Sequence, residues 1–292
     1  MKSKIRERQT IAGDYSYIEY YPVFEIPSSG GKRKNKYKAT SAQQQHLNER
    51  NSRIKLEQTI HTNFDDTSYT IHPTYDDAFL PLSDKCARHD MQNYIRRIRR
   101  IFEAAGLDKD ALKYIYVTQY GEQSGRCHHH IIISGGVPRE KLIEAWGMGR
   151  VNVDNLQFNE SGVADLAEYI GREGGKKKKS PMPEVWKKRW CGSKNLKKPK
   201  VKTRDNVIRR KDIKYIDDNC YEKSLVTVAC RKTIEDRYEG YTLNECEVIR
   251  NEINNGVYVR MKLYRTESPL LAWRKTLFEK AKKGERQSNN AF

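Results

Sequence analysis

The sequence predicts an α+β fold in which an antiparallel sheet carries helices on one face. Short apolar runs rich in β-branched and aromatic residues are typical of strands, and they cover residues 69–72, 114–118, 128–133 and 150–158. Two segments with apolar residues at helical spacing separate these runs, at 84–106 and 138–146. The resulting order of strand, helix, strand, strand, helix, strand is the split βαβ order of ferredoxin-like domains. The second face of such a sheet is expected to stay available for a ligand.

The helix predicted over 84–106 has the clearest pattern. Asp84 is placed to cap its first turn. Its apolar side consists of Met91, Ile95, Ile98 and Phe102. Pro138 is placed to open the next helix, since proline is tolerated in a first helical turn. Further helices are expected over 41–60 and 163–172.

The two ends of the chain look less regular than its middle. Residues 1–40 combine an aromatic patch, a Pro-Ser-Ser-Gly-Gly segment and a basic run, which indicates a mobile basic arm. Strand-like pieces at 224–229 and 257–264, with a basic C-terminal helix, follow the central region. We therefore expect three parts: a basic arm and helix over 1–55, a functional domain with a basic segment over 56–202, and an accessory region over 203–292.

The charge of the chain indicates the kind of partner it binds. Lys and Arg number 56 against 38 Asp and Glu, so the formal charge is 56 − 38 = +18, which favours nucleic acid first and anionic membrane second. No run of about 18 apolar residues occurs, so no membrane-spanning segment is expected. The six cysteines form no CxxC pair, and we interpret them as reduced thiols of a cytoplasmic protein. No Gly-x4-Gly-Lys-Ser/Thr motif occurs, which argues against a fused helicase.

The most informative stretch is a predicted hairpin over 114–133 that carries three consecutive histidines. Side chains alternate along a strand, so His128 and His130 share one face and His129 points to the other. Two imidazoles on one rigid face are suited to bind a metal. A third ligand is expected from the facing strand, either Gln119 or Glu122, and such a set suits Mg²⁺ or Mn²⁺ at a phosphate. The alternative is a polar strand that binds no metal.

Among the 18 tyrosines, Tyr169 is distinguished by its position. It falls at the edge of the apolar stripe of the helix predicted over 163–172, with Asp165 and Arg172 as its helical neighbours. Its hydroxyl can therefore face a polar cleft beside a cation that binds phosphate. The alternative is an edge aromatic residue that covers the core.

Together, these elements resemble the HUH endonucleases, and in particular their replication initiators. The run from Gly125 to Ile132 resembles the motif in which two histidines flank an apolar residue, and 169–172 resembles a Tyr-x-x-Lys helix. The strand at 69–72 resembles the family's first motif. Asn63-Phe64 and the stretch from Trp190 to Pro199 resemble initiators of phages and integrative elements of Gram-positive bacteria.

The resemblance covers about residues 40 to 200, and three residues depart from the family pattern. His129 stands where an apolar residue is usual, and Arg172 stands in place of the lysine. Glu173 stands where a second tyrosine would lie, which indicates a single-tyrosine enzyme.

The resemblance implies a metal-dependent endonuclease that nicks and rejoins single-stranded DNA at a replication origin and starts rolling-circle replication. Tyr169 would be the nucleophile and form a 5′-phosphotyrosine bond, with Arg172 beside it. A host helicase or polymerase is a further candidate partner. The candidate DNA contacts are Lys176, Lys177, Lys178, Lys179, Trp186, Trp190 and Lys194. The lysines can equally form a solvated loop, and the tryptophans can pack against the domain.

Three rival functions share part of this pattern. A non-enzymatic single-strand binding protein would use only the basic and aromatic residues. A transposase or relaxase of the same superfamily would share the chemistry but not the substrate. A hydrolase with a metal-activated water would leave no covalent product.

Overall fold

A computed structural model describes residues 3–24, 42–121, 124–159, 161–163, 190–222, 225–251 and 256–269. The chain divides into two compact units. The central unit consists of Gln45–Gln157 and Val163–Lys198, and the flanking unit of Met1–Gln44, Phe158–Gly162 and Pro199–Phe292. This division differs from the three consecutive parts expected from the sequence, because both ends of the chain enter one unit.

The central unit contains a five-stranded antiparallel sheet with the order β6-β3-β5-β4-β7. Its strands are β3 (Tyr69–Pro73), β4 (Tyr114–Tyr120), β5 (Cys127–Ile133), β6 (Val151–Asn155) and β7 (Cys191–Gly192). Helix α2 (Asp84–Ala104) connects β3 to β4, and α3 (Arg139–Glu144) connects β5 to β6. The predicted α+β class and the predicted order of elements are confirmed, while the finer likeness to ferredoxin-like folds stays a prediction.

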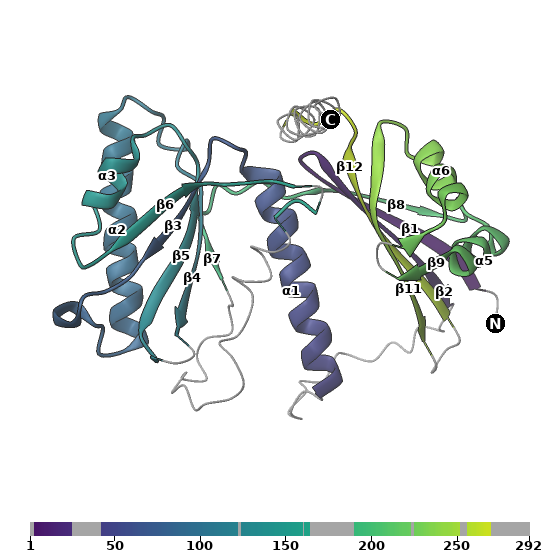
Figure 1. Ribbon diagram of the computed structural model, residues 1–292, viewed down its shortest axis with the longest axis horizontal. Coiled ribbons are helices and arrows are strands. Elements are labelled where there is room, and N and C mark those ends of the chain that lie inside the picture. Colours follow the sequence, from purple (N-terminus) through teal and green to yellow (C-terminus); the bar gives the residue numbers. More distant parts are fainter. Residues whose placement is uncertain are drawn as a thin grey trace, which may run out of the picture. The chain divides into compact units, whose positions relative to one another are not determined.

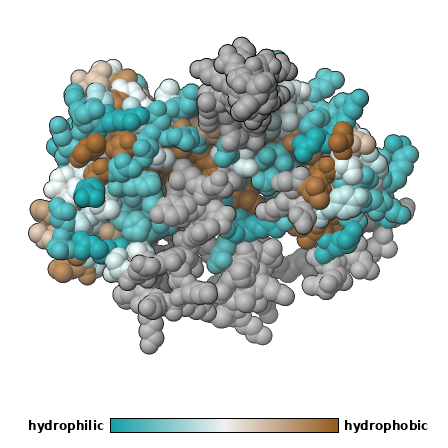
Figure 2. Space-filling model, in the orientation of Figure 1, coloured by the Kyte–Doolittle hydropathy of each residue, from teal (hydrophilic) through white to brown (hydrophobic). Residues whose placement is uncertain are grey.

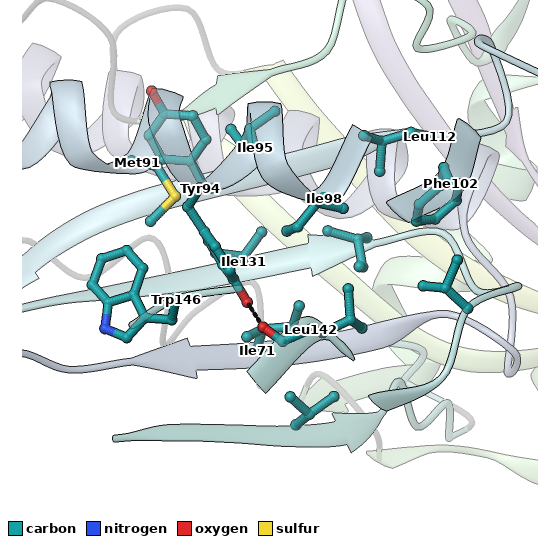
Figure 3. Close-up of a cluster of buried hydrophobic side chains, with 14 of the residues drawn as sticks. Ile71, Met91, Tyr94, Ile95, Ile98, Phe102, Leu112, Ile131, Leu142 and Trp146 are labelled. Carbon is teal, nitrogen blue, oxygen red and sulfur yellow. Dashed lines mark hydrogen bonds between the residues drawn. The ribbon is translucent and has the colours of Figure 1, made fainter. Parts of the chain in front are cut away.

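The core of the central unit lies between α2, α3 and one face of this sheet. Met91, Ile95 and Ile98 of α2 pack with Ile71 of β3 and Ile131 of β5 (Figure 3). The Tyr94 hydroxyl donates a 2.7 Å hydrogen bond to the Leu142 carbonyl oxygen, and Trp146 is fully buried beside them. This packing confirms the predicted apolar side of the 84–106 helix.

The cap of α2 differs from the prediction by one residue. Ser83 is the N-cap, and its hydroxyl accepts a 3.3 Å hydrogen bond from the Cys86 amide. Serine is a strong N-cap because its short side chain reaches an amide that has no partner within the helix. Asp84 instead lies in the first turn, where its charge favours the helix dipole, and its carboxylate accepts a hydrogen bond from the Tyr120 hydroxyl.

The second face of the central sheet is not free of helices as expected. Ile115 and Ile132 point to this face, and both are fully buried. Figure 1 shows α1 (Ala42–Asn63) on this side of the sheet, with α2 and α3 on the other. Leu56 and Ile60 of α1 are buried as well, so we infer that α1 covers the apolar part of the second face. The predicted helix over 41–60 is confirmed, and the one over 163–172 lies outside the described residues.

The flanking unit is built on a second five-stranded antiparallel sheet, with the order β11-β12-β2-β1-β8. Its strands are β1 (Ser3–Ala12), β2 (Tyr15–Phe24), β8 (Lys200–Asp205), β11 (Tyr241–Asn251) and β12 (Gly256–Arg265). The predicted irregular arm over 1–40 is therefore wrong for residues 3–24, which form a hairpin inside this sheet. The predicted strand over 257–264 is confirmed by β12.

Helices α5 (Arg210–Asn219) and α6 (Val228–Arg237) pack against the flanking sheet, and a small hairpin, β9 (Cys220–Glu222) with β10 (Leu225–Val226), lies between them in the sequence. The strand predicted over 224–229 is wrong beyond Val226, because Thr227 caps α6 by accepting a hydrogen bond from the Cys230 amide. The predicted basic C-terminal helix lies outside the described residues.

The described surface is mainly polar on the face that Figure 2 shows, with apolar residues in small separate groups. Within the described part of the chain, no helix combines the length and the apolar character needed to cross a membrane.

A buried carboxylate ties the N-terminal hairpin into the flanking unit. Glu7 of β1 is 1% exposed and accepts hydrogen bonds from the Tyr238 hydroxyl at 2.8 Å, the Tyr20 hydroxyl at 3.2 Å and Nε of Arg204 at 2.9 Å. A buried charge is tolerated when it is paired and hydrogen-bonded in this way. Residues from β1, β2, β8 and the end of α6 therefore depend on a single side chain.

Replacing Glu7 tests the correction of the N-terminal arm. We expect Glu7→Ala to lower the free energy of unfolding of the flanking unit by about 2–4 kcal/mol, because a guanidinium and two phenol groups lose their partner. Glu19→Ala is the matched control on the same hairpin, since Glu19 makes only long ion pairs, 3.8 Å to Arg8 and 3.6 Å to Arg260. It should cost no more than about 1 kcal/mol in urea unfolding. Equal stability of Glu7→Ala and the unsubstituted protein would contradict the described hairpin.

Candidate active site

The histidine hairpin has the register expected from its sequence. Gln119 of β4 lies directly opposite His128 of β5, and Val117 lies opposite His130. The connection is closed by a 2.9 Å hydrogen bond from the Gly121 amide to the Arg126 carbonyl oxygen. Gly125 has a φ of 64°, a left-handed conformation that favours glycine. The turn therefore centres between residues 123 and 124, and the predicted facing position of Gln119 is confirmed.

His128 and His130 lie side by side on the second face of the central sheet. Their ring centroids are 5.1 Å apart, and the rings meet edge to face at 83°. Nδ1 of His128 donates a 3.3 Å hydrogen bond to the Arg126 carbonyl oxygen, which leaves the Nε2 lone pair of that tautomer for another partner. His130 is only 2% exposed, and burial lowers its pKa to about 3, so its imidazole is neutral near pH 7. Neutral imidazoles are the form that binds metal ions.

His129 points to the opposite face and enters the core, as the alternation predicts. Its Nε2 lies 2.9 Å from the Tyr75 hydroxyl and its Nδ1 lies 2.9 Å from the Thr118 hydroxyl. The side chain is fully buried, and burial lowers its pKa to about 3. Both ring nitrogens have partners, which explains how a histidine occupies a core position where an apolar residue is usual in the HUH motif.

A third imidazole that the sequence did not single out lies beside this pair. His72 of β3 follows Ile71, which pairs with Ile131, so His72 faces His130 across the sheet. The two ring centroids are 4.6 Å apart. Burial lowers the pKa of His72. Alternation within the predicted strand 69–72 gave its face, but the pairing of that strand with the hairpin was not readable from the sequence.

The end of β3 is fixed against the histidine hairpin from two sides. Arg126 donates a 2.8 Å hydrogen bond to the Tyr75 carbonyl oxygen and forms an ion pair with Asp77. The Trp146 indole donates a 2.8 Å hydrogen bond to the Thr74 carbonyl oxygen. Both contacts involve backbone carbonyls, so they hold the strand itself in place beside His128.

The possible metal ligands can be placed only in part. Within the described ranges, no group of three or more His, Cys, Asp or Glu side chains is arranged to hold a metal ion. The pair of His128 and His130 with the Gln119 amide opposite falls outside that definition, because glutamine is not among these residue types. Glu122, the alternative third ligand, lies outside the described residues.

The remaining predicted site residues fall into two groups. Tyr169, Arg172, Lys176, Lys177, Lys178, Lys179 and Trp186 lie outside the described residues. Trp190 is half-buried and Lys194 is exposed, and both flank β7 at the edge of the central sheet. Their roles in DNA binding stay predictions.

The segment around Lys194 also closes the central unit. The Asn195 side-chain amide donates hydrogen bonds to the carbonyl oxygens of Asp110 at 2.9 Å and Leu112 at 3.2 Å. The Asn63 side chain receives the Lys197 amide at 2.7 Å and donates to the Lys197 carbonyl oxygen at 2.9 Å. Two asparagines that carry part of the family resemblance therefore have structural contacts.

The region that carries the hairpin matches a known protein family. Residues 70–174 match the family model of the replication-associated protein ORF2. The matched region includes β3, the three histidines, Gln119 and Tyr169, and covers just over a third of the chain. The match supports a role of this region in DNA replication. No match to the chain was found among curated proteins or among solved structures.

The hydrogen bonds of His129 can be tested by stability. We expect His129→Leu to lower the free energy of unfolding of the central unit by about 1–3 kcal/mol, because the Tyr75 and Thr118 hydroxyls lose their partner. The triple variant Tyr75→Phe/Thr118→Val/His129→Leu should recover much of this loss, since no polar group is then left without its histidine partner. Chemical unfolding monitored by Trp146 fluorescence measures both. A triple variant less stable than the single one would contradict the described arrangement.

Proposed function

We propose that the central unit nicks and rejoins single-stranded DNA at a replication origin and so starts rolling-circle replication. The observation that carries this proposal is the pair of neutral imidazoles, His128 and His130, on one face of β5 within a region that matches a replication-associated family. The formal charge of +18 supports a nucleic-acid substrate. The HUH resemblance supports the nicking chemistry.

His128 and His130, with the Gln119 amide oxygen opposite His128, are the residues that would hold a divalent metal ion. Two nitrogen donors and one oxygen donor leave coordination positions for water and phosphate, and the nitrogen donors favour Mn²⁺ over Mg²⁺. When bound, such an ion polarises a phosphate oxygen and stabilises the charge that develops there. The Nδ1 hydrogen bond of His128 orients its ring, which is the usual function of a carbonyl next to a ligating histidine.

Tyr169 is the proposed nucleophile. Its phenol oxygen would attack the scissile phosphorus and lose its proton, while the bond from phosphorus to the 3′ oxygen breaks and that oxygen takes up a proton. The 5′ side of the DNA is then linked to the tyrosine, and the free 3′-hydroxyl can prime a polymerase. Attack of a 3′-hydroxyl on the phosphotyrosine reverses the step and rejoins the strand, so no ATP is consumed. Arg172 would stabilise the added phosphate charge.

The nucleophile is tested by trapping the covalent intermediate. With Mn²⁺ and a labelled single-stranded origin oligonucleotide, the full chain should give a DNA adduct on a denaturing gel, and Tyr169→Phe should give none. Tyr221→Phe is the matched control, because Tyr221 is 68% exposed on the flanking unit. An adduct formed by Tyr169→Phe would refute the assignment. Cleavage without any adduct would point to a hydrolase, and binding without cleavage to a non-enzymatic protein.

The metal ligands are tested on the same adduct. His128→Ala and His130→Ala should each slow adduct formation by about 100-fold or more, since each removes a group that holds the charge-stabilising ion. His89→Ala, on an exposed residue of α2, should leave the rate unchanged. Gln119→Ala and Glu122→Ala separate the two candidates for the third ligand, because only loss of the true ligand should raise the Mn²⁺ concentration needed for half-maximal rate. Equal rates for His128→Ala and the unsubstituted chain would rule out the metal site.

A further inference from the structure

The outer surface of α2 carries a row of arginines that the proposed catalytic site does not use. Arg96, Arg99 and Arg100 are all exposed, whereas the apolar side of the same helix is buried in the core. At about 100° per residue, the three side chains fall within an arc of roughly 100° on the helix surface. We call these three residues the arginine ridge.

The ridge is electrostatically uncompensated within the described part of the chain. None of its three guanidinium groups forms an ion pair with a described carboxylate, although Glu103 lies within one turn of Arg99 and Arg100. Like charges three and four residues apart destabilise a helix. Such an arrangement is therefore more favourable when an anion lies against it.

Neighbouring Arg97 shows what a structural arginine does on this helix. Its guanidinium donates hydrogen bonds to the carbonyl oxygens of Ala145 at 2.6 Å and Trp146 at 2.9 Å, just beyond the C-terminus of α3. Cations are favoured at that position because the helix dipole is negative there. No contact of this kind is found for the arginine ridge among the described residues.

A shallow groove between α2 and α3 extends the basic surface. It has a volume of about 380 Å³, and Arg100 and Lys141 contribute cations to its lining. Its other lining residues are Arg97, Ile101, Glu144 and Ala145. The groove places cations from two helices around one concave surface, which suits a phosphate chain better than a single small anion.

We propose that the arginine ridge, with Lys141, binds the phosphate backbone of duplex DNA that flanks the nicked strand. This inference rests on the proposed function for its substrate. The large aromatic side chains of α2 and of the turn after α3, Tyr94, Phe102 and Trp146, are at most 1% exposed, so the ridge offers no platform on which unpaired bases could stack. A straight row of fixed cations without stacking groups fits duplex phosphates, which are read by position and not by sequence.

The position of the ridge also favours a duplex over the strand that is cut. α2 covers the core face of the central sheet, while His128 and His130 lie on the second face. The ridge is on the outer side of α2, so the thickness of the helix, about 10 Å, and the sheet itself separate the two. One short single strand at the histidines would not lie along the ridge, whereas a flanking duplex can reach another surface.

The test compares duplex binding by the full chain and a triple variant. Arg96→Gln/Arg99→Gln/Arg100→Gln keeps good helix formers and should leave circular dichroism and thermal unfolding unchanged. Anisotropy of a labelled duplex without origin sequence, titrated from about 50 to 200 mM NaCl, should show about tenfold weaker binding or more for the triple variant. The slope of log affinity against log salt should fall by about 2–3, close to one per lost phosphate contact. Arg→Lys at all three positions should retain most of the affinity.

The control variant Lys55→Gln/Lys109→Gln/Lys232→Gln removes the same charge from exposed positions off the ridge and should bind duplex almost as well as the unsubstituted chain. Adduct formation on a short single strand should be unchanged in the ridge variant. Undiminished duplex binding by the ridge variant, an equal loss in the control, or an equal loss of single-strand affinity would overturn the proposal. Failure of the unsubstituted chain to form an adduct would instead refute the proposed nicking, and the duplex comparison would still decide the role of the ridge.

Discussion

The alternation of side chains along β5 is the constraint on which the candidate site depends. Cys127, Ile131 and Ile133 belong to the core between the sheet and α2, so every second residue of this strand must face that core. His129 shares their face and is accepted there because Tyr75 and Thr118 satisfy its two nitrogens. A register shift of one residue would bury His128 and His130 and expel the isoleucines. Apolar packing on one face thereby fixes the direction of the imidazoles on the other.

The same logic explains why the site is rigid. His128 and His130 sit on a central strand, with β4 and β3 on either side, and not on a loop. The neighbouring end of β3 is held through backbone carbonyls by Arg126 and Trp146. Positioning of ligands on strands supported by a well-packed core is more accurate than positioning on loops. His72, which faces His130, gains its place from this scaffold.

The parts of the fold that were predictable depend on local patterns. The period of α2, the three-histidine alternation and the position of Gln119 all follow from residues close together in the sequence. The flanking sheet depends instead on β2 pairing with β12, more than 200 residues away, and nothing local in residues 3–24 reveals that partner. Glu7 looked like one more charge in a polar arm, yet it is buried because Arg204, Tyr20 and Tyr238 come from distant segments. His72 was missed for the same reason.

The net charge of the chain takes on a more specific meaning once it is divided between surfaces. Under the proposed function, cleavage leaves the 5′ end covalently held and the 3′ end free, so nothing at the histidines retains the other parts of the DNA. Contacts through the arginine ridge would retain the flanking duplex without competing for the strand at the catalytic face. Such contacts are salt-dependent and independent of sequence, so they allow the duplex to move during replication while it stays bound. Sequence selection must then come from groups near the histidines or from the flanking unit, because a phosphate grip cannot supply it.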